Sequence, residues 1–219
     1  MSVRATAPSR AQKKAETRGA LKRAALACFA EHGYRETQVG DIAKRAKVAH
    51  GTFYVHFETK EALVDELLGE FNQALVARLE SAWQEHGAAD PERTARRLAE
   101  VCLEHWSEER QLLAAFAERV GSTSSLLTLR DGISPPVATF LAERLREVSA
   151  LSGSELREAE LVAQALLGLW TRVGLQYLFG PRIAKHVAVE LLATMSLGAL
   201  AAVLPALRQH VFKGEGRQP

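Results

Sequence analysis

Apolar residues recur at helical spacing along most of this chain, and this spacing predicts a protein built from helices. Leu21, Ala24, Ala25 and Cys28 share one face of a first helix, since residues three and four apart lie together on a helix surface. That helix is expected to end at Gly33, which readily adopts left-handed backbone. No segment alternates apolar and polar residues as a strand does. The fold class expected is therefore all-α.

Two short helices follow the first one. The earlier carries its apolar residues within 39–46, and the segment 47–49 then breaks the pattern. The later helix begins near His50 and buries Phe53 and Phe57, four residues apart. His50, Gly51, Thr52, Tyr54, Val55 and His56 are left on or near its outer face. Two short helices with a tight turn predict a helix-turn-helix, whose second helix enters the major groove of DNA.

The rest of the chain predicts longer helices. One is expected over 60–86, with an apolar stripe that includes Leu63 and Phe71. Asp90 and Pro91 form a helix start, a cap followed by a first-turn proline. Further helices are expected over 93–110, 112–120 and 135–151, then from a capping box at Ser152 and Glu155 to 178, and lastly after 181.

The last two helices are apolar over more than one face, so each needs burial on more than one side. Pairing of these helices with a second copy as a four-helix bundle would supply that burial. The residues expected at this dimer interface are Leu166, Leu192, Met195 and Ala199. A larger monomer core is the alternative. A two-fold dimer would place two recognition helices about 34 to 36 Å apart, or a multiple of this, on a palindromic operator.

Charge divides the chain unevenly. Residues 1–60 hold twelve Lys and Arg against five Asp and Glu, or +7, which leaves sixteen against twenty-one, or −5, for the rest of the 28 and 26. A basic N-terminal part on an acidic body suggests that this end faces a polyanion. Two cysteines and no signal peptide favour a reducing cytoplasm over secretion. The apolar run 191–207 is broken by polar residues and Pro205, so an interface helix is favoured over a membrane span.

A dense motif lies within residues 16–68. It comprises the segment 29–34 (FAEHGY), Thr37, 41–43 (DIA), Val48, 51–54 (GTFY), 56–57 (HF) and 60–63 (KEAL). These residues resemble the DNA-binding domain of the tetracycline-repressor (TetR) family, over about a quarter of the chain. The resemblance implies an N-terminal three-helix DNA-binding domain plus a larger helical effector-binding and dimerisation domain. The boundaries expected are a disordered basic arm over 1–15, the helix-turn-helix domain over 16–62, the effector and dimerisation domain over 63–213 and a flexible tail over 214–219.

The chain departs from the family pattern at two positions. Lys47 stands where the family usually has glycine, and left-handed backbone there would cost about 1 kcal/mol. Ala49 replaces the usual serine, so the next helix would lack a side-chain cap worth about 1 kcal/mol.

The resemblance also implies roles for single residues. Positions matching Thr52, Tyr54, His56 and Lys60 contact the DNA backbone in the family, and those matching His50, Gly51 and Tyr54 approach base edges. Lys60 opposes the dipole of its own helix, which a neighbouring phosphate would explain. Thr37 is expected to cap the second helix near a phosphate. For three of these residues an alternative stays open. Lys44 and Arg45 could contact the DNA backbone or stay solvated, and His56 could instead pack the third helix against the fourth. The DNA-binding residues expected are Thr37, Lys44, Arg45, His50, Gly51, Thr52, Tyr54, Val55, His56 and Lys60.

The resemblance implies that the body binds a small organic effector, and aromatic and polar residues of the body could line its pocket, since pockets between helices are mostly apolar with a few polar groups. The ligand-binding residues expected are Trp106, Phe116, Arg119 and Trp170, with ordinary core packing as the alternative for each. Two Cys and His pairs at helical spacing lack the further ligands that a metal site needs, so neither a metal nor a cofactor is expected.

Together with the resemblance, these patterns predict a dimeric transcriptional regulator, a repressor that a small effector releases from an inverted-repeat operator. An activator with the same fold is one alternative. Another is an interaction or ligand-binding protein that keeps the fold without specific DNA binding. An enzyme is not expected, because no nucleophile, base or metal cluster stands out from the helical pattern.

Overall fold

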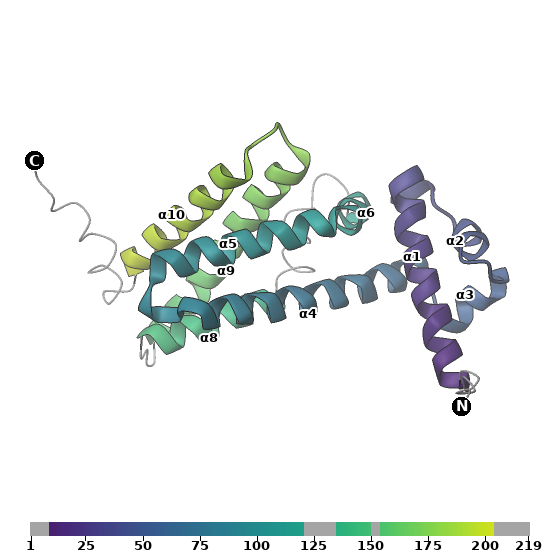
Figure 1. Cartoon of the computed structure of the whole chain (residues 1–219), viewed down its shortest axis with the longest axis horizontal. Coiled ribbons are helices and arrows are strands. Elements are labelled where there is room, and N and C mark those ends of the chain that lie inside the picture. The colour runs from purple at the N-terminus through teal and green to yellow at the C-terminus, as the bar shows by residue number, and fades with distance from the viewer. Residues whose placement is uncertain (1–8, 121–134, 150–153, 204–219) are drawn as a thin grey trace, which may run out of the picture. The chain divides into compact units, whose positions relative to one another are not determined.

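The computed structural model describes residues 9–120, 135–149 and 154–203, and these ranges are helical with no strand (Figure 1). The all-α fold class is thereby confirmed. The helices are α1 (Arg10–Glu36), α2 (Val39–Arg45), α3 (His50–His56), α4 (Lys60–His86), a short 3-10 helix (Gly87–Ala89), α5 (Pro91–Glu108), α6 (Arg110–Val120), α8 (Pro135–Ser149), α9 (Ser154–Phe179) and α10 (Lys185–Val203).

The chain forms two compact units. The first, here called the head, comprises Met1–Leu68 and Gln111–Ser122, and the second, here called the body, comprises Gly69–Arg110 and Thr123–Pro219. The long helix α4 supplies residues to both. The limits of α4 agree with the predicted helix over 60–86. The Thr59 hydroxyl caps α4 by accepting the Ala62 N–H at 3.0 Å.

The head packs α1 against the two short helices. Its core is formed by apolar side chains that are nearly or completely inaccessible to solvent, including Leu21, Ala25, Ile42, Phe53 and Leu63. These residues belong to α1, α2, α3 and the first turns of α4. The spacing that predicted each helix therefore also identified the face that it buries.

Helix α1 starts earlier than the sequence suggested. Ser9 and Gln12 form a capping box, in which the Ser9 hydroxyl accepts the Gln12 N–H at 3.1 Å and the Gln12 side chain accepts the Ser9 N–H at 2.6 Å. Residues 10–15, assigned to an irregular arm, are therefore helical. Gly33 (φ 80°, ψ 164°) interrupts the helix at the predicted place, before a last turn that reaches Glu36.

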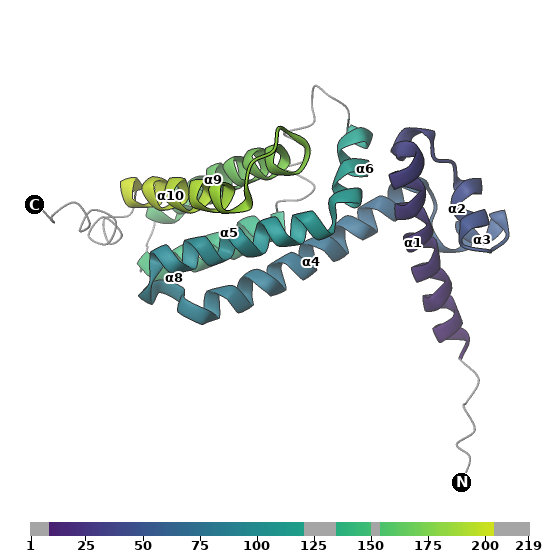
Figure 2. The ribbon, with the colours of Figure 1, turned by 45° about the horizontal axis from the view of Figure 1, so that its top comes forward.

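In the body, α5 packs against α10 and α9, and α9 packs against α8. Figure 2 shows α5 lying between the α9 and α10 pair and the distal part of α4. Asp90 caps α5 as predicted, since its carboxylate accepts the Arg93 N–H at 3.0 Å. Helices α5, α6 and α8 each lie one or two residues earlier than predicted at one or both ends. The expected cap at Ser152 lies outside the described residues.

Within the described part of the chain, no helix has the combined length and apolarity needed to cross a bilayer.

Candidate nucleic-acid interface and apolar cavity

The turn between α2 and α3 is a Schellman motif. The Val48 N–H donates to the Ala43 carbonyl at 3.0 Å, and the Lys47 N–H donates to the Lys44 carbonyl at 3.1 Å. Lys47 has a φ of 57° and is the one non-glycine residue with positive φ in the described ranges. The expectation of left-handed backbone at Lys47 is confirmed, and with it the strain that a side chain creates there.

Two phenylalanines fix α3 from its inner side. Phe53 is 0% exposed and Phe57 is 3% exposed, and their ring centroids lie 5.7 Å apart. The guanidinium of Arg18 lies 4.2 Å above the Phe57 ring. At the start of α3, Ala49 occupies the N-cap and its side chain makes no hydrogen bond, as predicted. The helix is thus held by packing and lacks the usual cap.

The opposite face of α3 is open. His50 and Gly51 are exposed, as are Tyr54 (51%) and Val55 (70%), while Thr52 is half-buried. The His50 and Tyr54 rings meet edge to face at 5.5 Å. A Cβ added to Gly51 would meet no atom within 4 Å. Internal packing therefore does not require glycine at this position, and the missing side chain leaves room for an external partner.

His56 occupies the last turn of α3 and is half-buried. Its carbonyl accepts a hydrogen bond from Arg18 Nη1 at 2.5 Å. Its ring Nδ1 is buried and has no hydrogen-bond partner among the described residues. Desolvation, reinforced by the charges of Arg18 and Lys14, lowers the pKa of His56, so the ring is neutral at pH 7. This placement is compatible with both predicted roles, phosphate contact and packing.

Lys60 makes internal contacts that the sequence did not indicate. Its Nζ donates to the carbonyls of Tyr34 at 2.6 Å and Thr37 at 2.7 Å, and it lies 4.2 Å from the Tyr34 ring centroid. Carbonyls at the end of α1 are the negative end of that helix, which favours a cation. The position of Lys60 in the first turn of α4 therefore has an internal explanation, and phosphate contact stays a prediction.

Thr37 does not cap α2. Its hydroxyl donates to the Gly33 carbonyl at 2.7 Å, and the residue is only 1% exposed. Gln38 is the N-cap instead, and its N–H donates to the Asp41 carboxylate at 3.0 Å. The predicted cap is wrong because the non-helical Gly33 turns the Thr37 side chain back to α1. Its burial leaves the hydroxyl little access to a phosphate.

Lys44 and Arg45 are both exposed on α2. Arg45 forms a bidentate pair with Glu31, with Nη to Oε distances of 2.5 and 2.6 Å. This hydrogen-bonded pair lowers the pKa of Glu31 and raises the pKa of Arg45. Lys44 makes no ion pair within the described ranges, so its charge is the more available of the two.

The carboxyl end of α6 completes the head. A Glu118 carboxylate oxygen accepts the Tyr34 N–H at 2.7 Å, and the Arg35 Nε donates to the Glu118 carbonyl at 3.2 Å. A Cβ at Gly33 would lie 3.0 Å from the same carboxylate. Arg119 pairs with Asp65 at 2.5 Å. Sequence reasoning missed these contacts, since no local pattern links residues 84 positions apart.

An ion cluster joins α1 to α4 in the head and was also missed. Arg18 Nε donates to a Glu66 carboxylate oxygen at 2.8 Å, and Lys22 forms a second ion pair with Glu66. The hydrogen bonds and charges of these two cations, with Arg18 the larger cause, lower the pKa of Glu66 to about 2 despite its partial burial. The cluster lies beside α3, because Arg18 also holds the His56 carbonyl.

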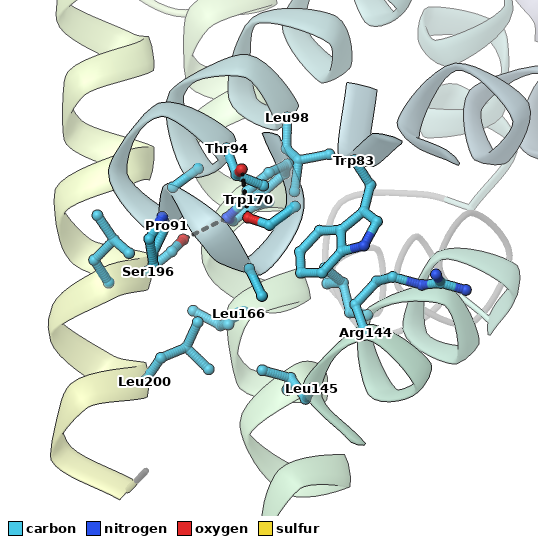
Figure 3. Close-up of a pocket in the computed structure, with 15 residues that line it drawn as sticks. Trp83, Pro91, Thr94, Leu98, Arg144, Leu145, Leu166, Trp170, Ser196 and Leu200 are labelled. Carbon is cyan, nitrogen blue, oxygen red and sulfur yellow. Dashed lines mark hydrogen bonds between the residues drawn. The ribbon is translucent and has the colours of Figure 1, made fainter. Parts of the chain in front are cut away.

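The body contains an apolar cavity with an empty volume of about 710 Å³, counting its open mouth (Figure 3). Side chains from α4, α5, α8, α9 and α10 converge on it. The lining residues are Trp83, Gly87, Ala88, Pro91, Thr94, Ala95, Leu98, Leu141, Arg144, Leu145, Leu166, Trp170, Ser196, Leu197 and Leu200.

One of the four predicted ligand residues lines this cavity, namely Trp170. Trp106 is 3% exposed in the body core, where its ring lies so close to Gly174 that an added Cβ would approach it to 2.7 Å. Phe116 and Arg119 belong to the head. The sequence could not separate these aromatic residues, because burial and cavity lining select the same residue types.

The predicted interface residues also divide into two groups. Leu166 (5% exposed) and Leu192 (0%) are buried within their own chain, so they cannot form the surface of an interface. Met195 (46%) and Ala199 are exposed on α10. Helical spacing alone could not separate the two groups, since positions 192, 195 and 199 are three and four residues apart and lie on neighbouring rows of α10.

The head has the architecture of a helix-turn-helix DNA-binding protein, with a helix anchored by Phe53 and Phe57 and open on its other face. The model for "bacterial regulatory proteins, tetR family" matches residues 21–67. Over these residues the chain is similar to the DNA-binding part of this family.

Two known regulators are similar in sequence to part of the chain. The transcriptional repressor KstR2 of Mycobacterium tuberculosis is 51% identical over 61 residues, which cover 28% of this chain and 30% of the repressor. The fatty acid metabolism regulator protein of Bacillus subtilis is 37% identical over 84 residues, covering 38% of this chain and 41% of that protein. These matches span less than half of either relative.

Solved structures match over most of the chain. A transcriptional regulator from Rhodococcus is 27% identical and has a TM-score of 0.64, covering 84% of this chain and 96% of that one. The fatty acid degradation regulator FadR of Bacillus halodurans is 24% identical, with a TM-score of 0.66 over 89% and 98% of the two chains. The second likeness supports the fold alone.

Proposed function

We propose that this chain is a homodimeric transcriptional regulator that binds an inverted-repeat DNA operator and is released from it by a small organic effector. The observation that carries the proposal is the outer face of α3. His50, Gly51, Tyr54 and Val55 are exposed there, while Phe53 holds the helix in place. A helix of this kind can enter the major groove and read base edges.

The surface of α9 and α10 supports dimerisation. Leu161 (65% exposed), Val187 (48%), Leu191 (43%) and Met195 (46%) are large apolar residues open to solvent. With the exposed Ala165 and Ala199, these residues form one apolar stripe on α9 and one on α10, since they are spaced four residues apart within each helix. A second copy of the chain would cover both stripes. In this proposal the interface uses these exposed residues and not Leu166 or Leu192.

The relatives bear on the direction of regulation. KstR2 is named a repressor, which favours repression, although an activator would use the same DNA-binding face. The apolar cavity of the body supports an effector site. An effector that binds the DNA-free conformation more tightly would shift the population toward release. A location in the cytoplasm, with the DNA, stays a prediction.

Selection of bound sequences from a random duplex pool tests the proposal. The wild type is expected to recover an inverted repeat. Gly51→Leu should abolish the enrichment, because the new side chain fills the face that approaches the bases. Gly69→Leu is the matched control, since a Cβ at Gly69 also meets nothing within 4 Å but the residue lies on α4. A folded, dimeric wild type that enriches no motif would overturn specific DNA recognition.

Salt dependence separates phosphate contacts from internal ones. A lost phosphate contact lowers the slope of log affinity against log salt by about 0.9 per charge. Lys44→Ala is expected to show this reduction. Lys60→Ala will show it only if Lys60 leaves the Tyr34 and Thr37 carbonyls for the DNA. A lower stability with an unchanged slope would assign Lys60 to positioning of the head.

A further inference from the structure

The wall of the body cavity is almost entirely hydrocarbon. Leucines from α5, α8, α9 and α10 cover most of it, and the rings of Trp83 and Trp170 complete it (Figure 3). All of these residues belong to the body, so the cavity is complete within one unit. A cavity of this kind favours a ligand that is itself apolar.

Two of the polar side chains in the wall, Thr94 and Trp170, already have partners. The Thr94 hydroxyl donates to the Gly87 carbonyl at 2.8 Å, and Trp170 Nε1 donates to the Ser196 hydroxyl at 2.9 Å. Ser196 is 4% exposed, and its own hydroxyl hydrogen is still available to a ligand. Ser196 is therefore a neutral hydrogen-bond donor in the wall.

Arg144 does not make the cavity cationic. Its terminal nitrogens pair with Glu147 at 2.9 Å and lie 3.9 Å from both Glu80 and Glu143, while its buried Nε has no hydrogen-bond partner among the described residues. Figure 3 shows the side chain extending away from the other lining residues. Three carboxylates near the guanidinium oppose the entry of an anion, because they already neutralise its charge.

We propose that this cavity binds an uncharged, mainly aliphatic molecule with a single hydrogen-bonding oxygen, which faces Ser196, and that it rejects the corresponding carboxylate. The inference deepens the proposed effector site and rests on it for its regulatory meaning. A carboxylate inside this wall would lose its hydration without gaining a cationic partner. An alcohol loses much less and gains the Ser196 donor.

The test compares straight-chain alkan-1-ols with the alkanoates of equal length at pH 8, where the acids are ionised. Intrinsic fluorescence reports binding, because two of the three tryptophans of the chain line the cavity. The alkanol dissociation constant is expected to fall about fourfold for each added methylene until the cavity is full. Each alkanoate is expected to bind at least tenfold more weakly.

Two variants change the cavity in opposite directions. Ala95→Leu narrows it and should shorten the best alkanol, whereas Leu200→Ala widens it and should lengthen the best alkanol. Ala77→Leu makes the same change as Ala95→Leu at an exposed position of α4 outside the cavity, and it should leave the series unaltered. The fluorescence titration needs no DNA, so its result does not depend on the DNA-binding activity of a variant, and circular dichroism verifies that each variant is folded.

Equal binding of alkanol and alkanoate would overturn the ligand class, and binding of neither would overturn the site. The site would also be overturned if the alkanol length that binds most tightly were the same in the wild type, Ala95→Leu and Leu200→Ala. Regulation is tested separately, by titrating the alkanol into the protein–operator complex and measuring release of the DNA. Alkanol binding by a protein that selects no DNA motif would uphold this inference while the proposed function fails.

Discussion

Lys47→Gly should stabilise the head, because Lys47 carries left-handed backbone at φ 57°. That conformation costs an ordinary residue about 1 to 2 kcal/mol. Glycine removes this cost but loses about 0.5 to 1 kcal/mol through the greater freedom of the unfolded chain. The main-chain hydrogen bonds of the Schellman motif do not depend on the side chain and persist. The net expectation is a gain of about 0.5 to 1 kcal/mol in the free energy of unfolding.

The assay must report on the head, which contains none of the three tryptophans. Hydrogen exchange of the α2 and α3 amides, combined with urea unfolding followed by circular dichroism, meets this need. Lys44→Gly is the matched control, since Lys44 lies in right-handed helix and should lose about 1 kcal/mol. The strain argument is refuted if Lys47→Gly lowers the urea midpoint or leaves head exchange unchanged while the control behaves as expected.

Three further changes test other parts of the structure. Ala49→Ser should stabilise α3 by about 1 kcal/mol, measured by urea unfolding, because its hydroxyl can accept an N–H of the first turn; no gain would mean that the bond from the Thr52 N–H to the Ala49 carbonyl, at 2.8 Å, already satisfies this helix end. Glu66 has a pKa lowered from 4.5 to about 2, so its stabilisation is present above pH 4.5 and is lost as the pH falls toward 2. The difference in free energy of unfolding between the wild type and Glu66→Gln should therefore become smaller as the pH falls from 4.5 toward 2. A difference that stays constant with pH would contradict a stabilising role of the ion cluster. Burial raises the pKa of the Cys102 thiol to about 12, so iodoacetamide should modify it only after unfolding.

The sequence predicted the helices well because each one has an apolar stripe at helical spacing. It also predicted the two weak points of the helix-turn-helix, since Lys47 and Ala49 break rules of local backbone chemistry that act within one turn. Local reasoning failed at Thr37, where a cap was expected. The non-helical backbone of Gly33 directs that hydroxyl to the preceding helix, and neighbouring residue types do not encode this direction.

Contacts between residues far apart in the chain could not be predicted from the sequence. A lysine in the first turn of α4 suggested a phosphate, but its amino group donates to the carbonyls of Tyr34, in α1, and of Thr37, just after α1. The cavity combines residues from five helices, of which only Trp170 was expected to bind ligand. Apolar residues that line a cavity and apolar residues that fill a core have the same spacing on a helix. Only the packing of the helices separates the two.

The family match and the folding unit of the head do not have the same limits. The match covers residues 21–67, whereas the compact head also contains Gln111–Ser122. From that segment, Glu118 accepts the Tyr34 N–H just after the non-helical Gly33, and Arg119 pairs with Asp65 on α4. Lys60 holds the carbonyl of the same Tyr34 from the other side. The end of α1, and with it the start of the helix-turn-helix, is therefore positioned by side chains from two distant segments. Substitutions in α6 should consequently alter the geometry of the proposed DNA-binding face, to which α6 contributes no residue.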